Sequence, residues 1–238
     1  MMKLSGLQKL TLLDFPGKTA ATVFTPGCNF RCPFCHNSDL VMGEIFEGST
    51  TFPEISLEEF FSFLEKRHGL LDGICITGGE PLLQNGIEDF CRRIKAEGFA
   101  VKLDTNGSFP EKLRALVDTG LIDYVAMDVK NSPARYGETV GLPAFDSEPV
   151  QASIDYLLRG AIPYEFRTTV VRELHDATSL HALACRLKGA NAWYLQSFID
   201  SETVLAGPHV LHPYTPEELQ ALLSPLQAII GPTHLRGV

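Results

Sequence analysis

The sequence predicts an α/β fold in which parallel strands alternate with helices, either as a barrel or as an open doubly wound sheet. Apolar, β-branched runs of strand length recur along the chain, segments of helical periodicity lie between them, and helix-capping residues stand at the junctions. The strand-length runs cover residues 19–25, 73–77, 99–104, 122–129, 164–171 and 192–198. Strand and helix repeat roughly every 25 residues, which favours parallel strands joined by right-handed crossovers.

Helices are predicted where apolar residues recur on one helix face. These faces are Leu57, Phe60, Phe61 and Leu64; Ile87, Phe90 and Ile94; Val150, Ile154, Leu157 and Leu158; Leu180, Leu183 and Leu187; and Leu219, Leu222, Leu223 and Leu226. Capping boxes that begin helices are formed by Ser56 with Glu59 and by Thr215 with Glu218. Glycines stand where helices should end, at Gly98, Gly120 and Gly160.

Length and composition predict one domain over residues 1–238, with residues 199–238 as a C-terminal closing segment. Hydrophobic residues make up 45% and charged residues 21%, which excludes disordered, collagen-like and coiled-coil chains. The net charge of −9 has the wrong sign for holding nucleic acid phosphates, so we expect no nucleic-acid partner. No apolar stretch matches a membrane span or a secretory signal, so we expect no membrane partner and a cytoplasmic location.

Three of the six cysteines, Cys28, Cys32 and Cys35, lie in one loop directly after the first predicted strand. In a reducing compartment such a group indicates metal chemistry rather than disulfides. A four-iron cluster usually takes four cysteines, so three would leave one iron open to an exogenous ligand. A closed zinc site completed by His36 is the alternative, although adjacent ligands strain tetrahedral wrapping. The remaining cysteines are expected to be small core residues without function: Cys75, Cys91 and Cys185.

Chemically unusual residues lie in or directly after the other predicted strands, near the carboxyl ends where parallel α/β folds build their sites. They are Gly78, Gly79, Glu80, Asp104, Asp128, Lys130, Arg167 and Gln196. Burying the charged side chains among apolar residues costs free energy unless they contact a ligand or pair with one another. Both a ligand-binding role and mutual pairing therefore remain possible for them. The two glycines would let the backbone approach a ligand or would form an ordinary turn, and Gln196 has a structural role as its alternative.

The cysteine loop, with Phe34 before Cys35 and Gly-Gly-Glu-Pro at residues 78–81, resembles the radical S-adenosylmethionine superfamily. Further motifs resemble the glycyl-radical activating enzymes, and the chain as a whole resembles, among them, the activating proteins of anaerobic ribonucleoside-triphosphate reductase. These motifs are Cys35-His36-Asn37, Asp104-Thr105-Asn106-Gly107, Asp128-Val129-Lys130 and Glu165-Phe166-Arg167. The resemblance covers most of the chain and implies an incomplete parallel (β/α)6 barrel.

The resemblance also implies the cofactors. Cys28, Cys32 and Cys35 would hold one [4Fe–4S] cluster, and S-adenosylmethionine would chelate its fourth iron. Contacts to S-adenosylmethionine are implied for Phe34, His36, Gly78, Gly79, Glu80, Asp104, Asp128, Val129, Lys130, Arg167 and Gln196, the last standing where some activases have histidine. As in some activases, Asp104 and Asp128 would also hold a monovalent cation. No cysteine lies between Cys35 and Cys75, so a second cluster is not expected.

The implied reaction is reductive cleavage of S-adenosylmethionine to a 5′-deoxyadenosyl radical, which removes a glycine Cα hydrogen from a partner enzyme. The partner implied is anaerobic ribonucleotide reductase, with a low-potential electron donor such as flavodoxin. The alternatives are activation of pyruvate formate-lyase or another glycyl-radical enzyme, a radical reaction on a small molecule such as that of a deazapurine synthase, and a zinc-stabilised barrel without catalysis.

Overall fold

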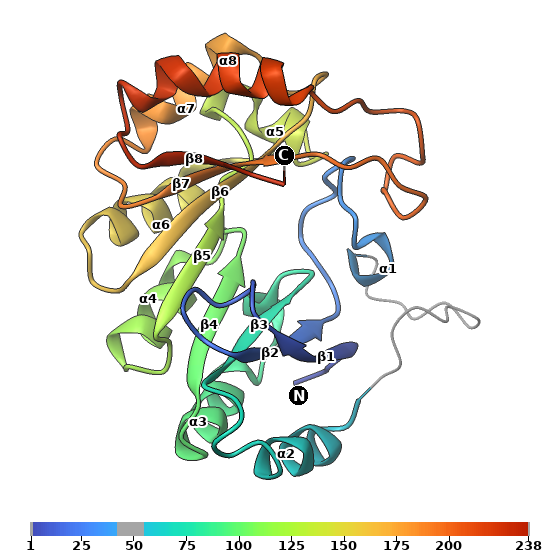
Figure 1. Cartoon of the computed structure of the whole chain (residues 1–238), viewed down its shortest axis with the longest axis vertical. Coiled ribbons are helices and arrows are strands. Elements are labelled where there is room, and N and C mark those ends of the chain that lie inside the picture. Colours follow the sequence, from blue (N-terminus) through green and yellow to red (C-terminus); the bar gives the residue numbers. More distant parts are fainter. Residues whose placement is uncertain (1, 42–54, 238) are drawn as a thin grey trace. The chain divides into compact units, whose positions relative to one another are not determined.

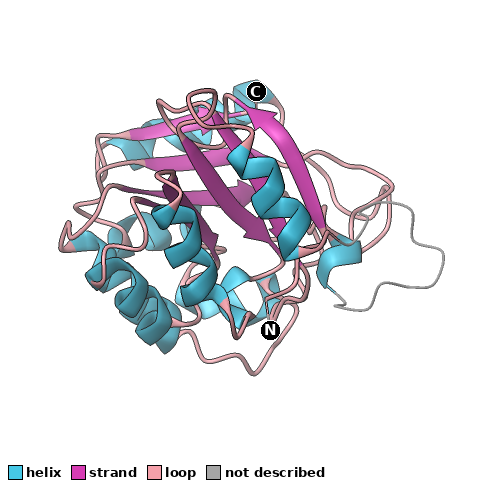
Figure 2. Cartoon of the chain, turned by 90° about the horizontal axis from the view of Figure 1, so that it is seen from below, coloured by secondary structure: helices cyan, strands magenta, loops and turns pink. Residues whose placement is uncertain are grey.

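The computed structural model describes residues 2–41 and 55–237 (Figure 1). Within them the chain forms two compact units. The first unit comprises Met1–Asn29, Asp39–Thr105 and Glu111–Val125. The second unit comprises Phe30–Ser38, Asn106–Pro110 and Ala126–Val238. Figure 2 shows the helices and strands of the described residues.

The first unit is built on four strands that are hydrogen-bonded in chain order. They are β1 (Gly6–Thr11), β2 (Ala20–Thr25), β3 (Gly73–Gly78) and β4 (Ala100–Thr105). β1 runs antiparallel to β2, whereas β2, β3 and β4 are parallel to one another. Thr25 pairs with Gly78, so β2 and β3 end at the same level and their following loops leave the sheet side by side.

Helices of the first unit bury the predicted apolar faces. The elements are α1 (Ser38–Val41), α2 (Leu57–Glu65), the 3-10 turn η1 (Pro81–Leu83), α3 (Ile87–Ala96) and α4 (Pro110–Asp118), with Ser38 and Pro110 counted in the second unit. The rings of Phe60 and Phe61 on α2 pack against Phe90 on α3, with centroids 5.1 and 5.8 Å away. The capping box of Ser56 and Glu59 is present at the start of α2, as predicted.

The second unit contains three neighbouring parallel strands, β6 (Tyr164–Val170), β7 (Trp193–Ser197) and β8 (Thr233–Arg236). β5 (Tyr124–Asp128) contributes its last three residues to this unit. The helical elements are η2 (Pro133–Arg135), α5 (Tyr136–Thr139), α6 (Glu148–Leu158), α7 (Ala177–Arg186) and α8 (Pro216–Gln227). Trp193 is fully buried, and its indole N–H donates to the Thr168 hydroxyl at 3.0 Å, which ties β7 to β6.

All six predicted strands are present, each within two residues of its predicted ends. β1 and β8 were not predicted, because the middle residues of β1 are exposed and β8 has a single buried residue among four, so neither shows an apolar pattern. The glycines predicted to end helices adopt positive φ, 84° at Gly98, 70° at Gly120 and 75° at Gly160. None of the helices in residues 2–41 and 55–237 is long and apolar enough to cross a membrane.

The expectation for the other cysteines is partly wrong. Cys75 and Cys91 are fully buried, but Cys185 is exposed on α7. The apolar face of α7 is formed by Leu180, Leu183 and Ala184, and Cys185 lies outside it.

Candidate active site

Cys28 lies three residues beyond the end of β2 in the first unit. The backbone N–H of Gly27 donates to the carbonyl of Leu40 at 2.6 Å, and that of Cys28 donates to the carbonyl of Val41 at 3.3 Å. Gly27 has a φ of 83°, a conformation that residues with a side chain rarely adopt. The turn carrying Cys28 is therefore fixed by backbone bonds to the end of α1.

Cys32 and Cys35 lie in the second unit, in a turn closed by the Cys35 N–H, which donates to the Cys32 carbonyl at 3.0 Å. The closing segment predicted from the sequence contacts this turn. Leu205 donates its N–H to the Cys35 carbonyl at 3.0 Å, and Ala206 donates to the Pro33 carbonyl at 2.9 Å. The backbone around two of the three cysteines is thus held by residues about 170 positions later in the chain.

The donor set fits a cluster of iron and sulfide by ligand type, because thiolates are the ligands that such clusters take. Cys32 is buried and Cys35 is half-buried. Burial raises the pKa of the Cys35 thiol, and nearby Lys130 opposes this effect. Across the described residues, no three histidine, cysteine or carboxylate side chains are already gathered as metal ligands. The fit therefore rests on the chemistry and spacing of the cysteines.

Gly78 and Gly79 allow the loops after β2 and β3 to touch. A Cβ at Gly79 would lie 2.0 Å from the carbonyl oxygen of Gly27, and a Cβ at Gly78 would lie 2.3 Å from the backbone nitrogen of Thr25. The N–H of Gly79 donates to the Thr25 carbonyl at 2.9 Å, and the N–H of Glu80 donates to the Gly27 carbonyl at 2.8 Å. These glycines support the segment that leads into Cys28.

The Glu80 side chain is fully buried in the first unit. Its carboxylate accepts hydrogen bonds from the N–H of Leu82 at 3.0 Å and from the hydroxyl of Thr105 at 2.8 Å. Glu80 therefore caps η1 and links it to the end of β4.

Gly79→Ala is expected to destabilise the protein by about 1–3 kcal/mol, because the added methyl group overlaps a backbone atom that cannot move alone. We also expect weaker iron binding, since the Cys28 turn must shift. Urea denaturation and iron analysis of anaerobically reconstituted protein measure the two effects. Gly231→Ala is the matched control, because a Cβ there meets open space. Equal stability and iron content in both variants would contradict the assigned role.

Asp128, Lys130 and Arg167 form an ionic cluster in the second unit. The Asp128 carboxylate lies 2.8 Å from Nε of Arg167 and 3.1 Å from Nζ of Lys130. Burial acts to raise the pKa of Asp128, but the two cations outweigh it and hold that pKa well below its usual range. Burial acts to lower the pKa of Lys130, but Asp128 keeps it above its usual range. The cluster thus keeps all three charges and carries one net positive charge.

The structure places the other predicted residues as follows. The ring of Phe34 is buried, and its centroid lies 6.0 Å from the ammonium nitrogen of Lys130. His36 Nε2 lies 2.5 Å from the carbonyl of Ile199. Val129 is tied to β6, since its N–H donates to the Arg167 carbonyl at 2.9 Å and its carbonyl accepts from the Thr168 hydroxyl at 2.7 Å. Gln196 is half-buried on β7, and Asp104 pairs with Lys102 in the first unit.

Sequence reasoning missed His175, which lies in the loop between β6 and α7. Its Nδ1 accepts from the N–H of Val171 at 3.1 Å, so its Nε2 carries the proton that is donated to the Lys130 carbonyl at 2.7 Å. The imidazole and the ring of Phe34 also form a T-shaped contact, with centroids 6.4 Å apart. A fully buried neutral histidine therefore fixes the backbone of Lys130 beside Phe34.

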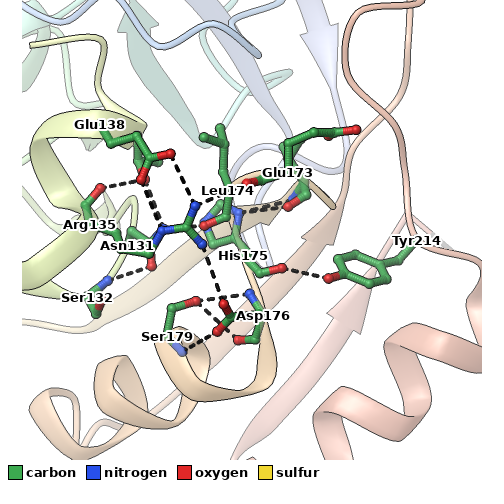
Figure 3. Close-up of polar contacts among 12 residues, drawn as sticks. Asn131, Ser132, Arg135, Glu138, Glu173, Leu174, His175, Asp176, Ser179 and Tyr214 are labelled. Carbon is green, nitrogen blue, oxygen red and sulfur yellow. Dashed lines mark hydrogen bonds and ion pairs between the residues drawn. The ribbon is translucent and has the colours of Figure 1, made fainter.

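The loop that carries His175 is itself held by polar contacts (Figure 3). Tyr214 donates its hydroxyl to the His175 carbonyl at 2.6 Å. The Arg135 guanidinium donates to the Glu173 carbonyl at 3.1 Å and lies 3.6 Å from the Asp176 carboxylate. These partners come from segments about 40 residues away on either side of the loop, so no local sequence pattern indicates them.

The pKa of His175 is lowered from 6.5 by burial and by Arg135, against the opposing effect of its backbone hydrogen bonds. The neutral form is favoured in the folded state, so its contribution to stability is complete above pH 6.5 and is lost as the pH falls below that value. The slope is at most about 1.4 kcal/mol per pH unit. We therefore expect the urea concentration at the unfolding midpoint of wild type to be lower at pH 5.5 than at pH 7.5.

His175→Gln is expected to reduce this pH dependence, because glutamine does not titrate. His181→Gln, at an exposed histidine on α7, is the control and should retain the wild-type pH dependence. A pH dependence of the midpoint that is unchanged in His175→Gln would disprove the assignment.

Comparisons with known proteins agree with these features. Residues 22–182 match the family model of the radical SAM superfamily. A candidate glycyl-radical enzyme activating enzyme of Methanocaldococcus jannaschii is 35% identical over 199 residues, 82% of this chain and 79% of that protein. A pyruvate formate-lyase-activating enzyme of Listeria monocytogenes is 29% identical over 75% of this chain and 74% of its own length. The crystal structure of a domain of pyruvate-formate lyase-activating enzyme from Bacteroides vulgatus has a TM-score of 0.55 at 16% identity, covering 69% of this chain and 99% of that one.

The match to the family model spans more than half of the chain. It confirms the predicted fold class, an α/β incomplete parallel barrel of radical SAM type, together with an enzymatic role and the cofactors of the family, a [4Fe–4S] cluster and S-adenosylmethionine. The alternative of a zinc-stabilised protein without catalysis is therefore set aside. The chain belongs to the radical SAM superfamily and, within it, to the glycyl-radical enzyme activating enzymes.

Proposed function

We propose that this activase generates the glycyl radical of an anaerobic ribonucleotide reductase. The proposal is carried by the loop of Cys28, Cys32 and Cys35 in a chain of activase type, with no further cysteine before Cys75. A single cluster suffices for this reaction. The motifs at residues 35–37, 104–107, 128–130 and 165–167 resemble the glycyl-radical activating enzymes in general, and the overall resemblance of the chain to reductase activating proteins supports the choice of partner.

The proposed ligands of the cluster are Cys28, Cys32 and Cys35, which leaves one iron for S-adenosylmethionine. We assign the carboxylate and ribose of S-adenosylmethionine to Asp128, Lys130 and Arg167, because their cluster is net positive and partly open to solvent. The remaining assigned contacts are Phe34 and His36 for the adenine, Gly78, Gly79 and Glu80 for the methionyl amino group, and Asp104, Val129 and Gln196 around them. When bound, the cluster and S-adenosylmethionine supply a carbon radical able to remove a glycine Cα hydrogen.

The chain's own task is to position the cosubstrate and to exclude water and unintended C–H bonds. We propose that residues 1–238 act as one radical SAM domain and that residues 199–238 close it. The backbone bonds from Leu205 and Ala206 to the cysteine turn support this role. We further propose that the protein works in the cytoplasm and receives its electron from a low-potential donor such as flavodoxin.

The test is to mix the reduced protein and S-adenosylmethionine under anaerobic conditions with an anaerobic ribonucleotide reductase, a pyruvate formate-lyase and other glycyl-radical enzymes. The glycyl doublet in electron paramagnetic resonance is expected with the reductase. A doublet with another enzyme and none with the reductase would reject the proposed partner. If none of these enzymes gave a doublet, but the protein formed 5′-deoxyadenosine in the presence of a small molecule, the proposal of a protein substrate would be rejected.

A further inference from the structure

Lys102 is a lysine buried in the core of the first unit. It occupies the middle of β4, and its side chain is 1% exposed. Its neighbours Val101 and Leu103 are also fully buried. Burying an unpaired ammonium costs several kcal/mol, so a lysine at such a position requires a partner. A hydrophobic residue of similar volume would pack here without that cost.

The partner of Lys102 is Asp104. Residues two apart on a strand point to the same side, and the ammonium of Lys102 forms an ion pair with the Asp104 carboxylate, whose side chain is 13% exposed. Cys75, the register partner of Lys102 on β3, lies on the same side, with its Sγ 3.8 Å from the ammonium and 3.6 Å from the carboxylate. The buried ammonium is therefore directed at the carboxylate that ends β4.

This pair bears on the monovalent cation that the family resemblance implies for Asp104 and Asp128. A cation site built on two carboxylates relies on negative charge that no side-chain cation already neutralises. Asp104 forms a neutral pair with Lys102 in the first unit, and in the second unit Asp128 meets both Lys130 and Arg167. Each carboxylate already has a side-chain cation of its own, so these residues do not fit a bound monovalent cation.

We propose that the ammonium of Lys102 is a built-in cation that holds Asp104 in place, so that this enzyme binds S-adenosylmethionine without a bound monovalent cation. The link to S-adenosylmethionine rests on the proposed function, which assigns Asp104 to the cosubstrate. Lys102 acts through Asp104 and is a positioning residue.

The experiment compares wild type, Lys102→Met and the double variant Lys102→Met with Asp104→Asn. Each protein is measured in potassium, sodium and choline chloride at equal ionic strength, so that general screening is constant. One measurement is the urea midpoint of unfolding. The other is the dissociation constant for S-adenosylmethionine, obtained by titration calorimetry of the anaerobically reconstituted protein.

Wild type is expected to give the same midpoint and the same dissociation constant in all three salts. Lys102→Met should have a lower midpoint in choline and bind S-adenosylmethionine at least about tenfold more weakly, because the partly buried carboxylate of Asp104 has lost the ammonium that balances its charge. Potassium or sodium should restore both quantities in this variant. The double variant, with neither charge, should show no difference among the salts.

Two results would overturn the proposal: a wild type whose midpoint or affinity falls in choline, or a Lys102→Met variant that responds equally to all three salts. The unfolding measurement requires neither S-adenosylmethionine nor a partner enzyme. If the proposed assignment of Asp104 to S-adenosylmethionine is wrong, the dissociation constant of Lys102→Met will equal that of wild type, while the salt response of the midpoint still tests the role of Lys102.

Discussion

Cys32→Ala is expected to abolish cleavage of S-adenosylmethionine, with a loss of at least about 10³-fold, because residues that only support a metal ligand are already worth about 10–100-fold. Without this thiol, the loop offers two of the three proposed sulfur ligands. Cys32 is small and buried, so the substitution should lower the free energy of unfolding by about 1 kcal/mol. Formation of 5′-deoxyadenosine and the iron and sulfide content of anaerobic preparations are the measurements.

Cys185→Ala is the matched control, since Cys185 is an exposed cysteine on α7 and should be dispensable. The two variants separate loss of a thiol in general from loss of a cluster ligand. If Cys32→Ala retained a full complement of iron and normal cleavage, the assignment of Cys28, Cys32 and Cys35 to the cluster would be wrong. Stoichiometric zinc in place of iron would point to the closed site with His36.

Asp128→Asn should have the second largest effect. The substitution leaves the cations of Lys130 and Arg167 without the carboxylate that both of them contact. Removing one partner of a buried ion pair costs about 3–5 kcal/mol, and the 30% exposure of Asp128 reduces our expectation to about 2–3 kcal/mol. We also expect S-adenosylmethionine to bind at least about tenfold more weakly, because both cations lose their fixed positions.

Urea denaturation and calorimetric titration measure the two effects. Asp155→Asn, the same substitution at an exposed position on α6, is the control and should change neither quantity.

The pKa of Asp128 is held below its ordinary value of 3.8, so its contribution to stability is complete above that pH and is lost as the pH falls further. The stability difference between wild type and Asp128→Asn should thus be constant from pH 5 to pH 7. If Asp128→Asn changed neither the stability nor the affinity for S-adenosylmethionine, the carboxylate would not be needed to position Lys130 and Arg167.

Local patterns were sufficient for much of the fold. Strand-length apolar runs and capping boxes predicted six strands and the starts of α2 and α8, because each depends on residues close together in sequence. β1 and β8 escaped prediction because their residues are largely exposed and only hydrogen bonds to β2 and β7 make them strands.

The glycines show a different kind of limit. From the sequence, Gly78 and Gly79 are compatible with a close approach of the backbone to a ligand or with an ordinary turn. The structure shows a close approach between two segments of the chain itself, the turn after β3 and the residues before Cys28. Which of these readings holds depends on what packs against the glycines, and a sequence pattern carries no such information.

The amino-acid sequence alone determines the superfamily, the alternation of strands and helices, and the three cysteines available as cluster ligands. All of these are properties of neighbouring residues. The pairing of charges was decided by the tertiary structure: Lys102 with Asp104, Arg167 with Asp128, and the buried His175 with the backbone of Lys130. The energies of these contacts depend on distance and burial, and for residues as far apart as Asp128 and Arg167 both are set only when the chain packs.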